Sequence, residues 1–215
     1  MKKRISRLNV ITFQMTLILF ICLSGCSTQS TDPALTQSPV MTSSAIDVEP
    51  RVTTDQVGED ADDPAIWVHP ADPSRSLILG TNKTLAPSGA LVVFGLDGKI
   101  RQTLDGLDRP NNVDVEYGLT LGGQPTDIAV VTERYQKRLR VFSIAPDGSR
   151  LTDASSVDAL GGFEGEVGER AAPMGIALYR RPSDGAIFAI VGRKEGPLEG
   201  YLWQYRLEDD GTGKV

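Results

Sequence analysis

The chain has 215 residues, a formal net charge of −6 at pH 7 and a single histidine. This acidic balance disfavours a nucleic-acid partner, because binding to a phosphate backbone needs clustered Lys and Arg side chains. Both cysteines, Cys22 and Cys26, lie near the N-terminus, so a disulfide framework is excluded for the rest of the chain.

The N-terminal segment has the pattern of an export signal. Four cations at positions 2, 3, 4 and 7 precede an apolar run at 10–23 that is too short and too interrupted to span a bilayer. Leu-Ser-Gly-Cys at 23–26 resembles the lipobox of bacterial lipoproteins, which implies that residues 1–25 are a signal peptide and that Cys26 carries acyl chains. Ser27 after this cysteine implies, in that class, the outer membrane. The alternative is an ordinary signal peptide or an uncleaved anchor.

Removal of residues 1–25 would change the net charge from −6 to −10, because this segment holds four cations and no acid. An acidic protein that handles an anion then needs a local group of cations or bound metal ions. Residues 26–47 are rich in Ser, Thr, Gln and Pro, so we expect a flexible tether there. Residues 48–215 are long enough for one ordinary core.

Short apolar runs separated by Gly, Pro, Asp and Asn predict an all-β domain from residue 48 onward. The runs fall into three groups, and Asp-Gly turns at 97–98, 147–148 and 210–211 follow the third run of each group. The predicted strands are 65–70, 76–82, 90–96 and 99–104, then 112–118, 127–133, 138–144 and 150–155, then 174–180, 186–192 and 201–207. Trp67, Trp203 and the tyrosines are assigned to the core.

Equivalent positions recur at intervals of about 50 to 60 residues, and four strands per unit at such a period are typical of a β-propeller blade. A β-sandwich with similar hairpins is the alternative. Propellers need about four to eight blades to close, so the three groups here predict a ring that is only partly present. The chain would then be a fragment of a longer reading frame or a truncated product.

Three cations occupy the same place in these groups. Lys83, Arg134 and Lys194 each follow the second strand, at the rim where the first strand begins, so ring geometry predicts a cationic arc near the channel. Acidic residues precede the first strand of the first group, namely Glu59, Asp60, Asp62 and Asp63, and Asp114 lies with Asn111 and Asn112 at the beginning of the second group. Each residue taken alone also fits a solvated turn or a weak surface ion pair.

Oxygen-rich clusters of this kind suit Ca²⁺, which takes six to eight oxygen ligands. Cations and carboxylates on one rim favour a phosphate ligand, and a metal-activated water could attack it near neutral pH. The sequence offers no supported protein nucleophile, since His69 falls inside a predicted strand and no thiol follows Cys26.

Four short motifs in this order resemble those of β-propeller phytases, which are six-bladed, calcium-dependent enzymes that remove phosphates from inositol hexakisphosphate. The motifs are Asp60 to Trp67, Gly80 to Lys83, Asn111 to Val115 and Gly192 to Gly196. The resemblance covers residues 48–215, about the first half of that family's domain.

This resemblance implies roles for individual positions. Asp63 and the carbonyls of Pro64 and Val113 would help hold structural calcium; Asp114 would be a ligand or a turn-stabilising acceptor. Lys83, Arg134 and Lys194 would contact the phosphate being cleaved, and Glu195 would bind a calcium ion that bridges it. The family has a tyrosine where this chain has Met174, and a thioether is a poor ligand for a hard cation.

The expected function is therefore calcium-dependent hydrolysis of phytate, as its calcium complex, by an exported, lipid-anchored protein that would be monomeric at full length. The alternative is a non-enzymatic propeller domain that keeps the anion site for binding or scaffolding. A calcium-dependent propeller lactonase is a third possibility, against which the cationic arc argues.

Overall fold

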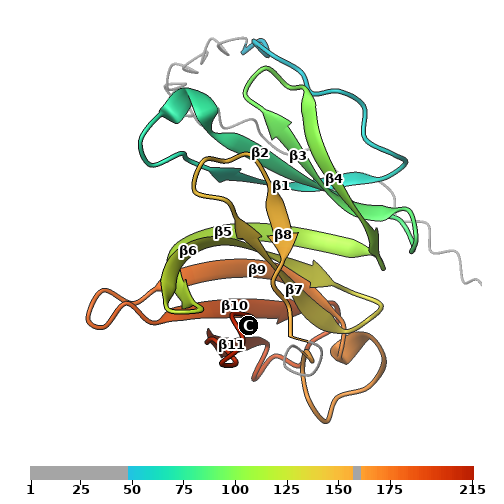
Figure 1. Cartoon of the computed structure of the whole chain (residues 1–215). Helices are drawn as coiled ribbons and strands as arrows, with labels where there is room; N and C mark the ends of the chain where they lie inside the picture. Colours follow the sequence, from blue (N-terminus) through green and yellow to red (C-terminus); the bar gives the residue numbers. More distant parts are fainter. Residues whose placement is uncertain (1–47, 157–160) are drawn as a thin grey trace, which may run out of the picture. The chain divides into compact units, whose positions relative to one another are not determined.

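The strands form three antiparallel sheets, which follow one another in sequence order (Figure 1). The structure is a computed structural model that describes residues 48–156 and 161–215, and these belong to one compact unit, Val48–Val215. The strands are β1 Ala61–Trp67, β2 Leu77–Asn82, β3 Gly89–Gly95, β4 Ile100–Leu107, β5 Pro110–Leu121, β6 Gln124–Glu133, β7 Arg138–Ile144, β8 Leu151–Asp153, β9 Pro173–Arg180, β10 Ile187–Arg193 and β11 Leu202–Leu207.

Each sheet is a meander in which consecutive strands pair, the arrangement of a propeller blade. The first two sheets have the orders β1-β2-β3-β4 and β5-β6-β7-β8, and the third, β11-β10-β9, has three strands within the described residues. Short 3-10 helices, η1 Pro73–Arg75 and η2 Gly168–Arg170, lie between strands. The predicted all-β bladed fold and the grouping of its strands are confirmed.

Two apolar layers hold the sheets together. One contains Trp67, Leu79 and Val93 from the first sheet against Val131 and Phe142 from the second. The other faces of β6 and β7 pack on the third sheet through a second layer, made of Ile128, Val130, Leu139, Val141, Ile187, Ala189, Val191 and their neighbours. The second sheet is thus covered on both faces, which explains the unbroken apolar run at 128–131 in β6.

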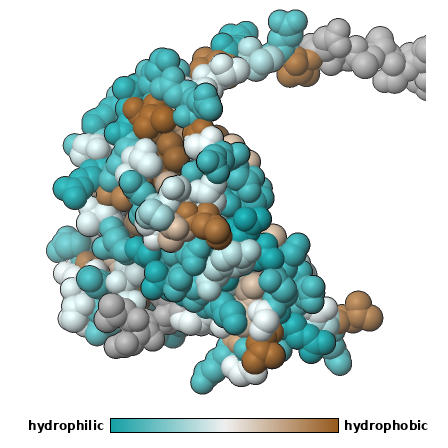
Figure 2. Space-filling model, turned by 90° about the vertical axis from the view of Figure 1, so that its right-hand side faces the viewer, coloured by the Kyte–Doolittle hydropathy of each residue, from teal (hydrophilic) through white to brown (hydrophobic). Residues whose placement is uncertain are grey.

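The first sheet has a second apolar face, over which the segment before β1 passes. Val57 packs on Ala90, Val92 and Phe94, and all seven residues of β3 are buried. The β3–β4 turn needs glycine at Gly98, whose φ is 78° and where an added Cβ would lie 2.4 Å from the carbonyl of Thr53. Figure 2 shows hydrophobic groups separated by hydrophilic residues on the face that it presents.

Two expectations for the first sheet and the core were wrong. β1 begins at Ala61 and ends at Trp67, so His69 lies beyond the strand, where its Nδ1 accepts the N–H groups of Ala71 and Asp72. Pro70 has no N–H to continue a ladder, which favours this turn. Tyrosines are also not uniformly core residues, because Tyr135 is 48% exposed.

The first strand of every sheet has the same irregularity at its start. The pairs Ala61↔Asn82 and Pro64↔Gly80 enclose one extra residue on β1, and the pairs Pro110↔Glu133 and Val113↔Val131 do the same on β5. On β9 the pairs Pro173↔Arg193 and Ile176↔Val191 likewise enclose one extra residue. These bulges re-aim the residues at one rim of each blade, which is where the candidate site lies.

Candidate functional site

The three rim cations occupy one structural position. Lys83, Arg134 and Lys194 each follow the last residue of the second strand, and each main-chain N–H donates to the residue that precedes the first strand. The acceptors are the carbonyls of Asp60 at 2.7 Å, Arg109 at 3.1 Å and Ala172 at 2.9 Å, respectively. The backbone therefore presents one cation per blade at the same rim.

The charges of these cations are balanced differently. Lys83 Nζ lies 3.0 Å from Asp62 and 3.9 Å from Asp60, while Arg134 Nη2 lies 2.5 Å from Glu169 Oε2. Lys194 is exposed and has no ion pair within the described part of the chain. An anion that binds to the arc would contact Lys194, which has no ion pair among the described residues, and also Lys83 and Arg134, which already form ion pairs with carboxylates.

Main-chain hydrogen bonds connect the three positions. Arg109 donates its N–H to the carbonyl of Thr84 at 2.9 Å and accepts from Arg134, so it links the rims of the first and second sheets. Glu169 links the second and third, because its carboxylate pairs with Arg134 while its carbonyl accepts the N–H of Glu195 at 3.3 Å. The structure thus joins the predicted positions through two residues that the motifs did not include.

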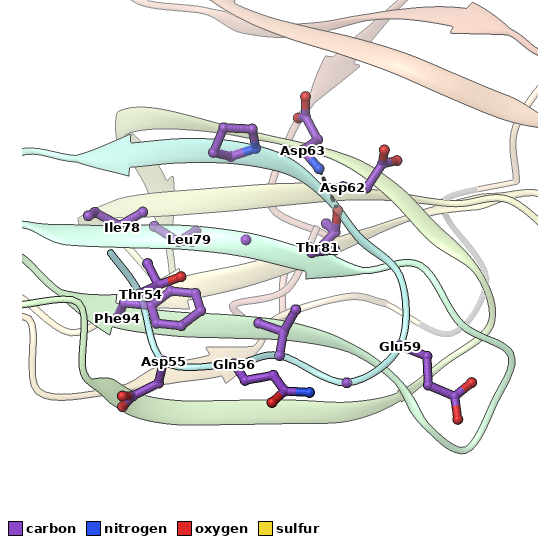
Figure 3. A pocket seen from close by; sticks show the side chains of 15 residues that line it. Thr54, Asp55, Gln56, Glu59, Asp62, Asp63, Ile78, Leu79, Thr81 and Phe94 are labelled. Atoms are coloured by element: carbon purple, nitrogen blue, oxygen red, sulfur yellow. Dashed lines mark hydrogen bonds between the residues drawn. The ribbon is translucent and has the colours of Figure 1, made fainter. Parts of the chain in front are cut away.

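Asp63 and Val113 lie together, at the starts of the first and second sheets. Asp63 Oδ2 accepts the N–H of Val113 at 3.0 Å, and the N–H of Asp63 donates to Thr81 Oγ1 at 3.1 Å. Pro64 and Val113 hold equivalent places, each directly after the bulge of its strand. In Figure 3 the carboxylates of Asp62 and Asp63 point away from the apolar side formed by Ile78, Leu79 and Phe94.

Asp114 uses both carboxylate oxygens to hold main chain. Its Oδ1 accepts the N–H of Val115 at 2.8 Å and its Oδ2 accepts the N–H of Leu178 at 2.7 Å. Leu178 belongs to β9, so Asp114 connects the inner strands of the second and third sheets. The sequence left two roles open for Asp114, a calcium ligand or a hydrogen-bond acceptor that stabilises a turn. In the structure, both of its oxygens accept main-chain N–H groups.

A pocket of 450 Å³ lies beside the acidic end of β1 (Figure 3). Ile78, Leu79 and Phe94 form its apolar side, and Glu59, Asp62 and Asp63 line its other end. The segment at 54–59 closes it against the first sheet. The pocket places three carboxylates near the rim from which Lys83 extends.

The residues beside Asp63 fit a hard cation. Asn111 is fully buried, and neither its Oδ1 nor its Nδ2 has a hydrogen-bond partner within the described residues, although its main-chain carbonyl accepts from Thr81 at 2.7 Å. Burying an unpaired amide is costly, and a cation would satisfy its oxygen. No three His, Cys, Asp or Glu side chains converge in the described part of the chain. One carboxylate, an amide oxygen and main-chain carbonyls would be a donor set of another kind, and oxygen ligands of these types are the ones that Ca²⁺ prefers.

Met174 holds the position equivalent to Asn111, and its main-chain carbonyl accepts a 2.7 Å hydrogen bond from Thr132 Oγ1. Glu195 is exposed, directly after Lys194. Sequence reasoning missed Arg109 and Glu169, and it also missed Tyr135, whose ring centroid lies 5.5 Å from Arg134 Cζ. Arg109 could have been found from its position directly before the Pro-Asn-Asn sequence. Glu169 lies in a loop without strand periodicity, so no sequence pattern pointed to it.

The predictions for residues 1–25, for Cys26 and for the tether at 26–47 lie outside the described residues. In the part of the chain that is described, none of the helices is both long and apolar enough to cross a membrane.

Together, the fold and the rim define a set of β-propeller blades that present cations and carboxylates side by side. The family model for phytases matches residues 12–215. The chain therefore belongs to the phytase family, of the β-propeller type.

A 3-phytase of Bacillus subtilis (strain 168) is 35% identical to this chain over 159 residues, which are 74% of this chain and 38% of that protein. The chain thus corresponds to less than half the length of this curated relative.

Proposed function

We propose that the chain belongs to a calcium-dependent phosphomonoesterase that removes phosphate from phytate presented as its calcium complex. The observation that carries this proposal is the equivalent placement of Lys83, Arg134 and Lys194 at one rim, beside the acidic start of β1. Membership of the phytase family and the name of the Bacillus relative support the substrate class.

The three cations would bind the phosphate being cleaved. Arg134 can present a planar fork to two phosphate oxygens, and Lys83 and Lys194 act as point charges. Lys83 is held by Asp62 at 3.0 Å, which limits the orientations of its ammonium group before substrate arrives. The backbone hydrogen bonds that fix all three positions reduce the ordering cost of binding.

Asp63, the carbonyls of Pro64 and Val113, and the buried amide of Asn111 would hold calcium at the start of the first two sheets. Glu195 would hold a second ion beside Lys194, as the resemblance implies. Calcium held by these residues would supply positive charge against the substrate's phosphates and would make a coordinated water more acidic. Asp114, with both oxygens on main-chain N–H groups, would keep the second and third sheets in register.

We also propose that the protein is exported and anchored through acyl chains on Cys26, at the outer membrane. The support for this is the basic start, the apolar run and the Leu-Ser-Gly-Cys sequence at 23–26. In cells treated with an inhibitor of signal peptidase II, the precursor should remain uncleaved. If the treated cells still produced the mature protein with the same mass as untreated cells, the lipid anchor would be contradicted.

The catalytic proposal is tested by phosphate release from phytate with excess calcium. Lys83→Ala, Arg134→Ala and Lys194→Ala should each lower kcat/KM at least about tenfold, because each removes a charge-assisted contact. Lys99→Ala is the matched control, since Lys99 is exposed and pairs with Asp55. Unchanged release in all three variants would refute the role of the arc. Phytate binding without release would favour the non-enzymatic alternative.

A further inference from the structure

The residue directly before each rim cation is polar and buried. Asn82, Glu133 and Arg193 are the last residues of β2, β6 and β10, and their exposed fractions are 5%, 0% and 3%. An apolar side chain at such a position would need no partner, whereas a buried amide or charge costs free energy unless it is paired. The repetition of this cost in one register points to a role at the rim.

Glu133 connects the segments that lie on either side of Arg134. Its Oε1 accepts the N–H of Asp108 at 2.7 Å, in the segment that leads into β5. Its Oε2 lies 2.6 Å from Nε of Arg138, the first residue of β7. Because Arg134 follows Glu133 directly, a shift of its main chain would strain one of these two contacts.

Asn82 makes the same connection before Lys83. Its Oδ1 accepts the N–H of Asp60 at 3.2 Å, directly before β1. Its Nδ2 donates to the carbonyl of Ser88 at 2.9 Å, directly before β3. The amide thus joins the entry of the first strand to the entry of the third strand, as Glu133 does in the second sheet.

Arg193 connects the corresponding segments of the third sheet with a different group. Its Nη1 donates to Glu166 Oε1 at 2.7 Å, in the segment before β9, and its Cζ lies 5.0 Å from the ring centroid of Trp203 on β11. An amide, a carboxylate and a guanidinium therefore make equivalent connections in the three sheets. What the three positions share is the pair of segments that they join, and the chemistry of the side chain differs.

We propose that Asn82, Glu133 and Arg193 are positioning residues, each of which fixes the main chain of the rim cation that follows it. The inference rests on the proposed function, in which the rim cations bind phosphate. A cation whose main chain is held before the ligand arrives loses less conformational freedom on binding, so the ligand binds more tightly. This gain explains why a buried polar group is kept at the end of each second strand.

Two variants test the proposal position by position in the full chain. Glu133→Gln removes the charge that pairs with Arg138, and NMR relaxation then gives the order parameter of each main-chain N–H. The order parameter of Arg134 should fall from about 0.85, the value of a rigid main chain, toward about 0.6, while that of Lys83 stays unchanged. Asn82→Ala should have the reverse effect, lowering the order parameter of Lys83 alone.

Binding of inorganic phosphate, measured by calorimetry, should weaken about two- to tenfold in both variants, because the rim cation must then be ordered by the ligand. Ile144→Val is the control for a loss of stability alone. Ile144 is buried at the opposite end of β7 from the rim, so this variant should change neither the order parameters of the rim cations nor the Kd for phosphate.

Unchanged order parameters in both variants would overturn the proposal, as would an equal fall at Lys83 and Arg134 in either variant. A loss of order without weaker phosphate binding would also overturn it, since the buried groups would then stabilise the fold without serving the ligand. If the unaltered chain bound no phosphate, the proposed function of the rim would fail. The order parameters would still decide whether these side chains fix the cations, because that readout needs no ligand.

Discussion

The hydroxyl of Thr132 donates a 2.7 Å hydrogen bond to the main-chain carbonyl of Met174, and so joins β6 of the second sheet to β9 of the third. The first and second sheets are joined in the same way, because Thr81 donates to the carbonyl of Asn111 at 2.7 Å. In both places the threonine lies one residue before the end of its strand, beside a rim cation. The distance between neighbouring rim positions is therefore set by a repeated polar contact as well as by the apolar layers.

Thr132→Val should destabilise the fold by about 1–3 kcal/mol, because Thr132 is fully buried and its hydroxyl also accepts the N–H of Asn112 at 3.0 Å. Valine keeps the shape and leaves both main-chain groups without their partner. Urea unfolding measures the effect, and Thr152→Val at an exposed position of β8 serves as the control. Equal midpoints for the two variants would show that the contact contributes little.

Glu169→Gln should strengthen the binding of inorganic phosphate roughly threefold, since it removes a partly exposed carboxylate that competes for Arg134. Calorimetry with inorganic phosphate measures the change directly. Glu208→Gln makes the same chemical change in the exposed pair with Arg206 and should have no effect. Weaker phosphate binding in Glu169→Gln would instead mean that the carboxylate orients Arg134.

Arg193→Ala should lower the free energy of unfolding by about 3 kcal/mol. The Arg193 side chain is 1% exposed, pairs with Glu166 at 2.7 Å, and has its Cζ 4.4 Å from the Phe163 ring centroid and 5.0 Å from that of Trp203. Arg193→Lys keeps the charge but not the planar group, so an intermediate loss is expected. A loss in Arg193→Ala no larger than in Arg193→Lys would contradict the importance of this stacking.

The β9–β10 hairpin predicts a dependence of stability on acid pH. The hydrogen bond from Arg181 and that from the N–H of Ala186 lower the pKa of Asp184 to about 2. Because the pKa is lower in the folded state than the ordinary value of 3.8, the stabilisation is present above about pH 4 and is lost as the pH falls toward 2.

Asp184→Asn should therefore lower Tm at neutral pH, and the difference from the unaltered chain should shrink between about pH 4 and 2. Asp105→Asn, at an exposed site on β4, is the control for a loss of negative charge. A Tm difference that stayed constant through this range would show that the pair does not titrate as described.

Much of the architecture follows from local sequence. The spacing of apolar runs predicted the three groups of strands, and β7 matches its predicted range, because alternation and Asp-Gly turns are local signals. The start of β1 was placed four residues late, because Asp62 and Asp63 have low strand propensity. Pairing with β2 and the hydrogen bond from Lys83 to Asp60 outweigh that propensity.

The sequence by itself determined the blade repeat and the common register of Lys83, Arg134 and Lys194, since both depend on the order of short local patterns. Only the tertiary structure decided which carboxylate balances which cation, that Asp114 holds main chain, and that Arg109 lies between two rim positions. Those relationships join residues of different sheets or loops, and no local periodicity specifies the distance between such groups. They arise because packing of the apolar layers brings the rims of the sheets together, and the polar groups there then pair with the nearest partners of suitable charge or hydrogen-bonding type.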